Sequence, residues 1–202
     1  MKIIKNLIPI IAASLLSACS FGPVNVAPET TYSLTQTPVL SPAKTIPTAT
    51  LMVMHVNAIR GFDSSNMMYQ EAPYELAAYS KNAWLAPPAS MMTPLIIKTM
   101  QDSGLFKAVV LGPSLSNTTY VLNASLLALY QDFTVNPSEI VLSLDVSFSN
   151  ASTTQLMADH IITERVSAKE GTPYSGVVAA NQAMSNVLVD MTHFVASHLS
   201  NS

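Results

Sequence analysis

The feature that most constrains the fold is a pair of long segments, 119–133 and 140–149, in which apolar and polar residues alternate. A strand places successive side chains on opposite faces, so this alternation predicts two strands with one face in the core and the other in water. Asn136, Pro137 and Ser138 predict a turn between them. The side chains expected in the core are Tyr120, Leu122, Ala124, Leu126, Ala128 and Tyr130 from the first strand, and Ile140, Leu142, Leu144, Val146 and Phe148 from the second.

Two helices are also predicted. Thr93 can cap the first helix and Pro94 suits its first position, with a turn from Pro88 as an upstream extension. Gly104 is placed to end this helix in the left-handed conformation. The second helix follows Pro173, and its apolar stripe has helical spacing: Val177, Ala180, Met184, Leu188, Met191, Val195 and Leu199.

Shorter apolar runs bounded by turn residues predict the remaining strands. They lie at 31–37, 51–59, 67–70, 74–80, 107–111 and 160–168. We therefore expect residues 31–202 to form a single α+β domain with a mainly antiparallel sheet and two helices packed on one face.

The first eighteen residues are typical of an export signal. A short basic segment precedes an apolar run at 7–16, well below the roughly 20 residues that a membrane-spanning helix needs. The run ends in Leu-Ser-Ala-Cys, which resembles the bacterial lipobox. It predicts cleavage between Ala18 and Cys19 and acyl chains on the Cys19 thiol. An ordinary secretory signal is the alternative, but Cys19 is the chain's single cysteine, so its position needs an explanation.

The residue after the lipobox cysteine influences sorting in such proteins, and Ser20 in place of Asp implies the outer membrane. We expect the acylated protein at the periplasmic face of that membrane, where its acyl chains bind lipid. Residues 19–30 form the acylated cysteine and a tether, and the tether spans about 36 Å when pulled straight.

The composition narrows the partners and the chemistry. Charged residues make up 10% of the chain, and loss of the signal leaves seven of the nine basic residues against twelve acidic ones. This balance argues against a nucleic-acid partner, which requires clustered Lys and Arg. We expect no enzyme activity, metal or cofactor, because no catalytic or metal-ligand spacing is present. The four histidines of the chain fit no such spacing and are expected at the surface or the edge of the core: His55, His160, His193 and His198.

The order of segments resembles the ABC-type transport auxiliary lipoproteins, the PqiC-like lipoproteins. The resemblance rests on Tyr32-Ser33-Leu34 near the mature start, and on a hairpin leading to Trp84 and then Pro87-Pro88. It continues in a helix that ends before Gly104-Leu105-Phe106, a long strand led by Tyr120, and a polar C-terminal helix. Leu85-Ala86 departs from the acidic residue that often follows the tryptophan in this family.

The resemblance implies a non-catalytic accessory subunit on the outer membrane. Its partners would be an MCE-domain protein and the permease and ATPase of an ABC transporter that moves lipid between membranes; the oligomeric state, a homo-oligomer included, stays open. Trp84 is either a plug in the sheet or a partner contact. A structural or assembly lipoprotein of the pilotin type is the alternative class, and a periplasmic enzyme is a third.

Overall fold

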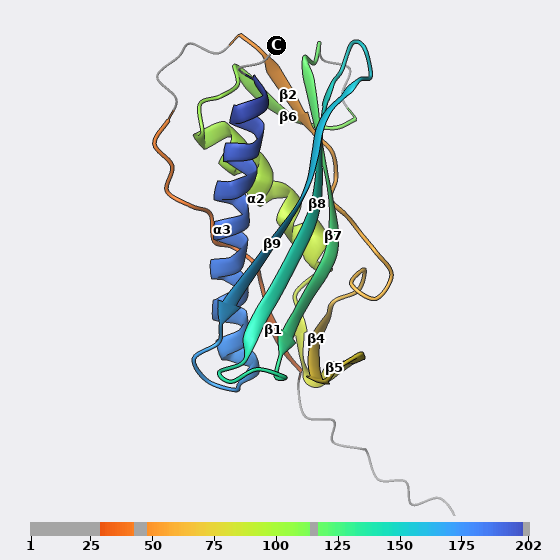
Figure 1. Ribbon diagram of the computed structural model, residues 1–202, viewed down its shortest axis with the longest axis vertical. Helices are drawn as coiled ribbons and strands as arrows, with labels where there is room; N and C mark the ends of the chain where they lie inside the picture. Colours follow the sequence, from red (N-terminus) through yellow and green to blue (C-terminus); the bar gives the residue numbers. More distant parts are fainter. Residues whose placement is uncertain (1–28, 43–47, 114–116, 200–202) are drawn as a thin grey trace, which may run out of the picture.

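The computed structural model describes residues 29–42, 48–113 and 117–199, and in them a large mixed sheet is covered on one face by two helices (Figure 1). The α+β prediction is therefore confirmed. The elements in chain order are β1 (Thr30–Tyr32), β2 (Thr50–Val53), β3 (Asn57–Ala58), β4 (Asn66–Ala72), β5 (Glu75–Trp84), α2 (Pro88–Asp102), β6 (Ala108–Leu111), β7 (Tyr120–Asp132), β8 (Glu139–Asn150), β9 (Leu156–Ser167) and α3 (Pro173–Leu199).

The long strands β7, β8 and β9 form an antiparallel meander, as the alternation predicts. The other edge of β7 carries β2, β3 and β4 one after another, and all three run parallel to it. Two further pairs are also parallel, β2 with β6 and β1 with β5. The sheet is thus mixed rather than purely antiparallel, because α2 and the chain around it cross over and return β6 in the direction of β2.

The core lies between the sheet and the two helices. The apolar row of β8 is almost inaccessible, with Leu144 and Phe148 both at 0% exposure. The stripe on α3 packs against it as predicted, fully buried from Val177 to Val195, with Leu199 partly buried at its end.

The regular alternation of β7 is interrupted. The register against β8 shifts between Leu126 and Ala128, and the strand therefore turns its following residues over. Ala128 and Tyr130, expected in the core, are only partly buried, whereas Leu129 and Gln131 are 2% and 1% exposed. The prediction for those two positions is wrong because side chains alternate between the two faces of a strand, and one extra residue moves every later side chain to the opposite face.

The start of α2 also differs from the expected one. The helix begins at Pro88, so the upstream extension is its true first turn and Thr93 lies inside it. The Thr93 hydroxyl donates to the Ala89 carbonyl at 3.2 Å and accepts a hydrogen bond from the Val56 backbone nitrogen at 3.0 Å. Thr93 thus joins the helix to the sheet instead of capping it, while Gly104 is left-handed as predicted (φ +65°).

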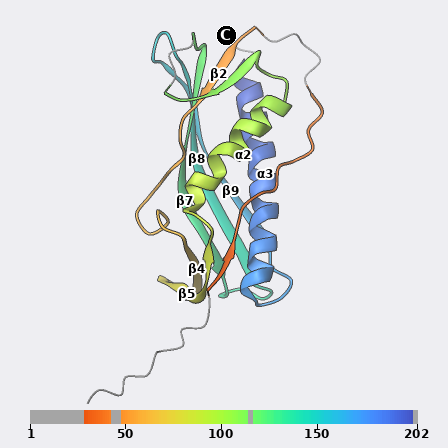
Figure 2. The same ribbon diagram turned by 180° about the vertical axis from the view of Figure 1, so that it is seen from behind.

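The expected strand at 31–37 is short, because only β1 pairs with β5. Beyond it, residues 33–42, which we call the strap, run along α3 (Figures 1 and 2). Asn181 of α3 binds the strap at several backbone atoms. The buried Leu34 side chain holds the start of the strap in the core.

The molecule has two distinct ends along its long axis. At one end lie the start of β1, the β4–β5 turn, the β7–β8 turn and the loop before α3; we call this the entry end (Figure 1). At the other lie β6, the β8–β9 turn and the last turn of α3, and we call this the far end (Figure 2). A helix of 27 residues such as α3 spans about 40 Å between them.

Candidate functional site

The candidate site lies along β9, which borders the sheet. Within the described residues β9 pairs with β8 alone, so its outer edge carries no further strand. A strand edge of this kind presents backbone donors and acceptors that another chain can pair with. Helix α3 runs beside it, and the two elements together border a line of hollows that we call the β9–α3 seam.

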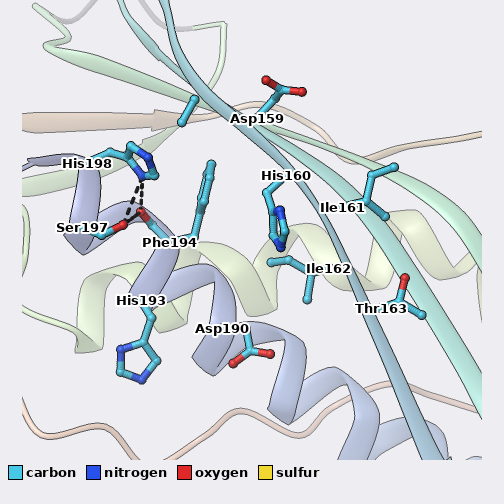
Figure 3. Close-up of a pocket in the computed structure, with 11 residues that line it drawn as sticks. Asp159, His160, Ile161, Ile162, Thr163, Asp190, His193, Phe194, Ser197 and His198 are labelled. Carbon is cyan, nitrogen blue, oxygen red and sulfur yellow. Dashed lines mark hydrogen bonds between the residues drawn. The ribbon is translucent and has the colours of Figure 1, made fainter.

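Strand pairing decides which side chains of β9 face the helix. His160 lies opposite Val146, and Ile162 lies opposite Leu144. Because Val146 and Leu144 point into the core, their partners on β9 lean toward α3 as well. Ile162 is therefore buried, while His160, closer to the far end, lines the wall of an open groove (Figure 3).

This groove has a volume of about 890 Å³ and occupies the far half of the seam. Phe194 lies at its centre, with its ring 6.2 Å from the His160 ring and 4.9 Å from the His198 ring (Figure 3). The remaining lining comes from residues 158–163 of β9 and from Asp190, His193 and Ser197 of α3. The groove therefore offers one phenylalanine ring within a wall of mixed polar and apolar character.

The orientation of the His198 ring is defined by a neighbour one turn earlier. Its Nδ1 lies 2.7 Å from the Phe194 carbonyl oxygen, and since a carbonyl only accepts, Nδ1 must carry a proton. The Ser197 hydroxyl is 3.1 Å from the same nitrogen. The rings of Phe194 and His198 thus lie side by side at the end of α3 and form an aromatic pair beside the groove.

The seam continues toward the entry end. In its middle, a hydrogen bond of 3.0 Å from the Asn186 side chain to Glu164 bridges α3 and β9 beside a smaller hollow. Beyond this bridge, a second hollow of about 410 Å³ is lined mainly by apolar atoms of Val166, Tyr174, Val178 and Ala179. The two halves differ in character, because the far half is mixed and histidine-rich and the entry half is mainly apolar.

The open face of the sheet carries the ion pairs near β9. Nη1 of Arg165 lies 3.5 Å from Oδ2 of Asp132 and 3.8 Å from Oε2 of Glu139. Arg165 thus pairs with residues of β7 and β8 and not with Glu164, which precedes it in the sequence. Burial raises the pKa of the Asp132 carboxyl, but hydrogen bonds from Thr134 and Arg165 outweigh burial and leave the pKa below its usual value. This cluster stabilises the β7–β8 turn.

The site residues predicted from the sequence divide into two groups. Ala18, Cys19 and Ser20 lie outside the described residues. Trp84 is 3% exposed and belongs to the core, so in this fold it has the role of a plug and offers no contact surface. His55 is exposed at the end of β2, away from the other three histidines, which all line the far half of the seam.

Two general features bear on the chemistry of the described part of the chain. Among residues 29–42, 48–113 and 117–199, no group of three or more His, Cys, Asp or Glu side chains is arranged to hold a metal ion. Neither described helix is long and apolar enough to cross a membrane.

Comparisons with known proteins support one family. Residues 32–192 match the family model described as ABC-type transport auxiliary lipoprotein component. A solved protein of the DUF330 family from Xanthomonas campestris superposes with a TM-score of 0.78, at 20% identity over 85% of this chain and 97% of that chain. An uncharacterized protein of known structure superposes with a TM-score of 0.65, at 13% identity over 83% of this chain and 99% of that chain. At these identities the likeness shows a shared fold, and no curated protein matches the chain.

Proposed function

Because the chain belongs to the family of ABC-type transport auxiliary lipoprotein components, we propose that it is the outer-membrane-anchored accessory subunit of an MCE/ABC-type lipid transport system. The observation that carries the proposal is the family match, which spans the domain from β1 to the last third of α3. The lipobox ending in Cys19 supplies the anchor, and Ser20 directs it to the outer membrane. The subunit is non-catalytic and acts by binding its partners.

We assign partner docking to the far half of the β9–α3 seam. The outer edge of β9 can accept a strand, and Phe194 provides an aromatic anchor beside it. Phe194 lies about 32 Å along α3 from Pro173, and thus from the entry end, where the chain from Cys19 joins the domain. An MCE-type protein approaching from the inner membrane would meet the far end first.

The experiment captures the full-length acylated protein from detergent-solubilised envelopes and identifies bound proteins by mass spectrometry. We expect an MCE-domain protein, the permease and the ATPase. Because the chain has few charged residues, recovery should change little with salt concentration.

A matched pair of variants assigns the surface. His160→Glu places a carboxylate beside Phe194 in the groove and should reduce recovery of the MCE protein. His55→Glu makes the same change at an exposed histidine away from the seam and should leave recovery unchanged. Recovery of secretin or pilus components in place of an MCE protein would contradict the proposal and favour the assembly-lipoprotein alternative.

A further inference from the structure

Several large apolar side chains are exposed at the entry end. Tyr74, in the β4–β5 turn, is 102% exposed, Tyr174 in the first turn of α3 is 63% exposed, and Val135 in the β7–β8 turn is 42% exposed. Three separate turns therefore each present an apolar residue at the same end of the molecule (Figures 1 and 2). One exposed apolar side chain is ordinary on a protein surface, but three on separate turns at one end of the domain suit a contact with another surface.

The chain that leads to Cys19 joins the domain at this same end. Tyr32, the last residue of β1, lies with its ring 6.2 Å from that of Tyr174, so the entry of the chain adjoins the exposed group. Between Cys19 and Thr30 there are too few residues to reach farther than about 36 Å. An anchor at Cys19 thus keeps the entry end within about 36 Å of the membrane.

From these relationships we propose that the entry end rests on the phospholipid surface, with Tyr74, Val135 and Tyr174 in its interfacial layer. The proposal depends on the acyl anchor of the proposed function and adds a second, non-covalent contact to it. Tyrosine suits the interface because its ring is apolar and its hydroxyl stays hydrated. The anchor makes this contact intramolecular, so that a small patch is sufficient.

The charges around the patch specify the kind of lipid surface. Glu71 and Glu75 flank the β4–β5 turn, and the loop before α3 carries Lys169 beside Glu170. No basic cluster is present in these turns, so anionic headgroups would gain little from the contact. The patch therefore suits a largely zwitterionic surface, and its insertion should not increase with the anionic lipid content.

The test measures the depth of spin labels on the acylated full-length protein in vesicles of phosphatidylethanolamine with a minor fraction of phosphatidylglycerol. Cys19 is the only cysteine and its thiol is acylated, so a label attaches only to an introduced one. Labels at Tyr174→Cys and Val135→Cys should be more accessible to oxygen, which concentrates in lipid, than to a water-soluble nickel complex. Labels at Leu111→Cys and Leu156→Cys, comparably exposed at the far end (43% and 53%), should show the reverse.

Each other outcome overturns the proposal in a distinguishable way. Protein that floats with the vesicles while all four labels favour nickel would show that the entry end stays in water. Shielding from both reagents, with spin coupling between molecules, would mean that a second copy of the chain covers the patch. Protein that does not float would overturn the anchor itself. None of these results depends on the MCE partner, so docking is tested independently.

Discussion

The side-chain oxygen of Asn181 accepts a hydrogen bond of 2.8 Å from the backbone nitrogen of Thr35. The same oxygen accepts a second one, of 3.2 Å, from Gln36, and the amide nitrogen of Asn181 donates to the Ser33 carbonyl at 3.1 Å. A single side chain of α3 thus satisfies three backbone groups of the strap. Asn181 thus provides hydrogen-bond partners for the backbone of the strap, as β5 does for the backbone of β1.

Replacing Asn181 by alanine should loosen the strap without unfolding the domain. The three backbone groups would turn to water, at a cost of about 1–2 kcal/mol in the free energy of unfolding. Hydrogen exchange should then accelerate at the amides of Thr35 and Gln36. The Asn181→Asp variant retains the acceptor and should protect both amides; equal exchange rates in all three proteins would argue against the clamp.

The hydroxyl of Tyr79 donates to the Gln131 side chain at 3.0 Å in a half-buried site. Burial, together with the nearby Tyr69 and Glu71, raises the pKa of Tyr79 from 10.0 to about 12. The folded state therefore binds this proton more tightly than the unfolded chain, so the stability from it is complete below pH 10 and is lost as the pH rises toward 12. Urea unfolding across this range should show a smaller alkaline decline for Tyr79→Phe, and an identical decline would refute the assignment.

Gly176 in the first turns of α3 lies against the Gln131 side chain, whose Oε1 occupies the space that a Cβ would need. Gly176→Ala should therefore displace Gln131 from its bonds to Tyr79 and Ser138 and destabilise the domain by about 1–3 kcal/mol. Gly171→Ala is the matched control, since its added carbon would meet only Phe133 at 3.7 Å. Thermal unfolding of both variants decides the matter, and equal melting temperatures would contradict the prediction.

Replacing Cys19 by serine should remove acylation and leave a precursor that keeps its signal peptide. Metabolic labelling with a palmitate analogue checks this, and label that persists on the variant would exclude Cys19 as the attachment site. Ser20→Asp provides the companion test of sorting, because it should keep an acylated protein in the inner membrane upon fractionation.

The reach of pattern reasoning is clearest on the long elements. Alternation in β8 and the apolar stripe on α3 correctly identify core residues such as Leu144 and Met184. In both elements one face is buried along its whole length, so the sequence pattern follows the geometry of the strand or the helix. The bulge after Leu126 has no signature in the composition, so the predicted buried and exposed faces of β7 are exchanged beyond it. Parallel pairing on β7 is equally hidden, since it depends on where distant segments return and not on their local pattern.

The groove at the far end escapes prediction for a related reason. His160 comes from β9 and Phe194 from α3, and only the packing of the helix on the sheet brings their rings together. The spacing of Phe194 and His198, four residues apart on a helix, was the one available signal that two rings share a face. Trp84, the most conspicuous residue of the sequence, is a core residue.

Because β2, β3 and β4 all pair with one edge of β7, none of these three strands can take its place in the sheet before β7 is present. If residues 1–18 direct export as predicted, we expect these segments to leave the translocation channel before the strand that they pair with. The β7–β8–β9 meander needs only short turns to close, so we expect it to form early and to provide the edge on which the other strands pair. We therefore expect β2, β3 and β4 to complete the sheet only after the second half of the chain has crossed the membrane.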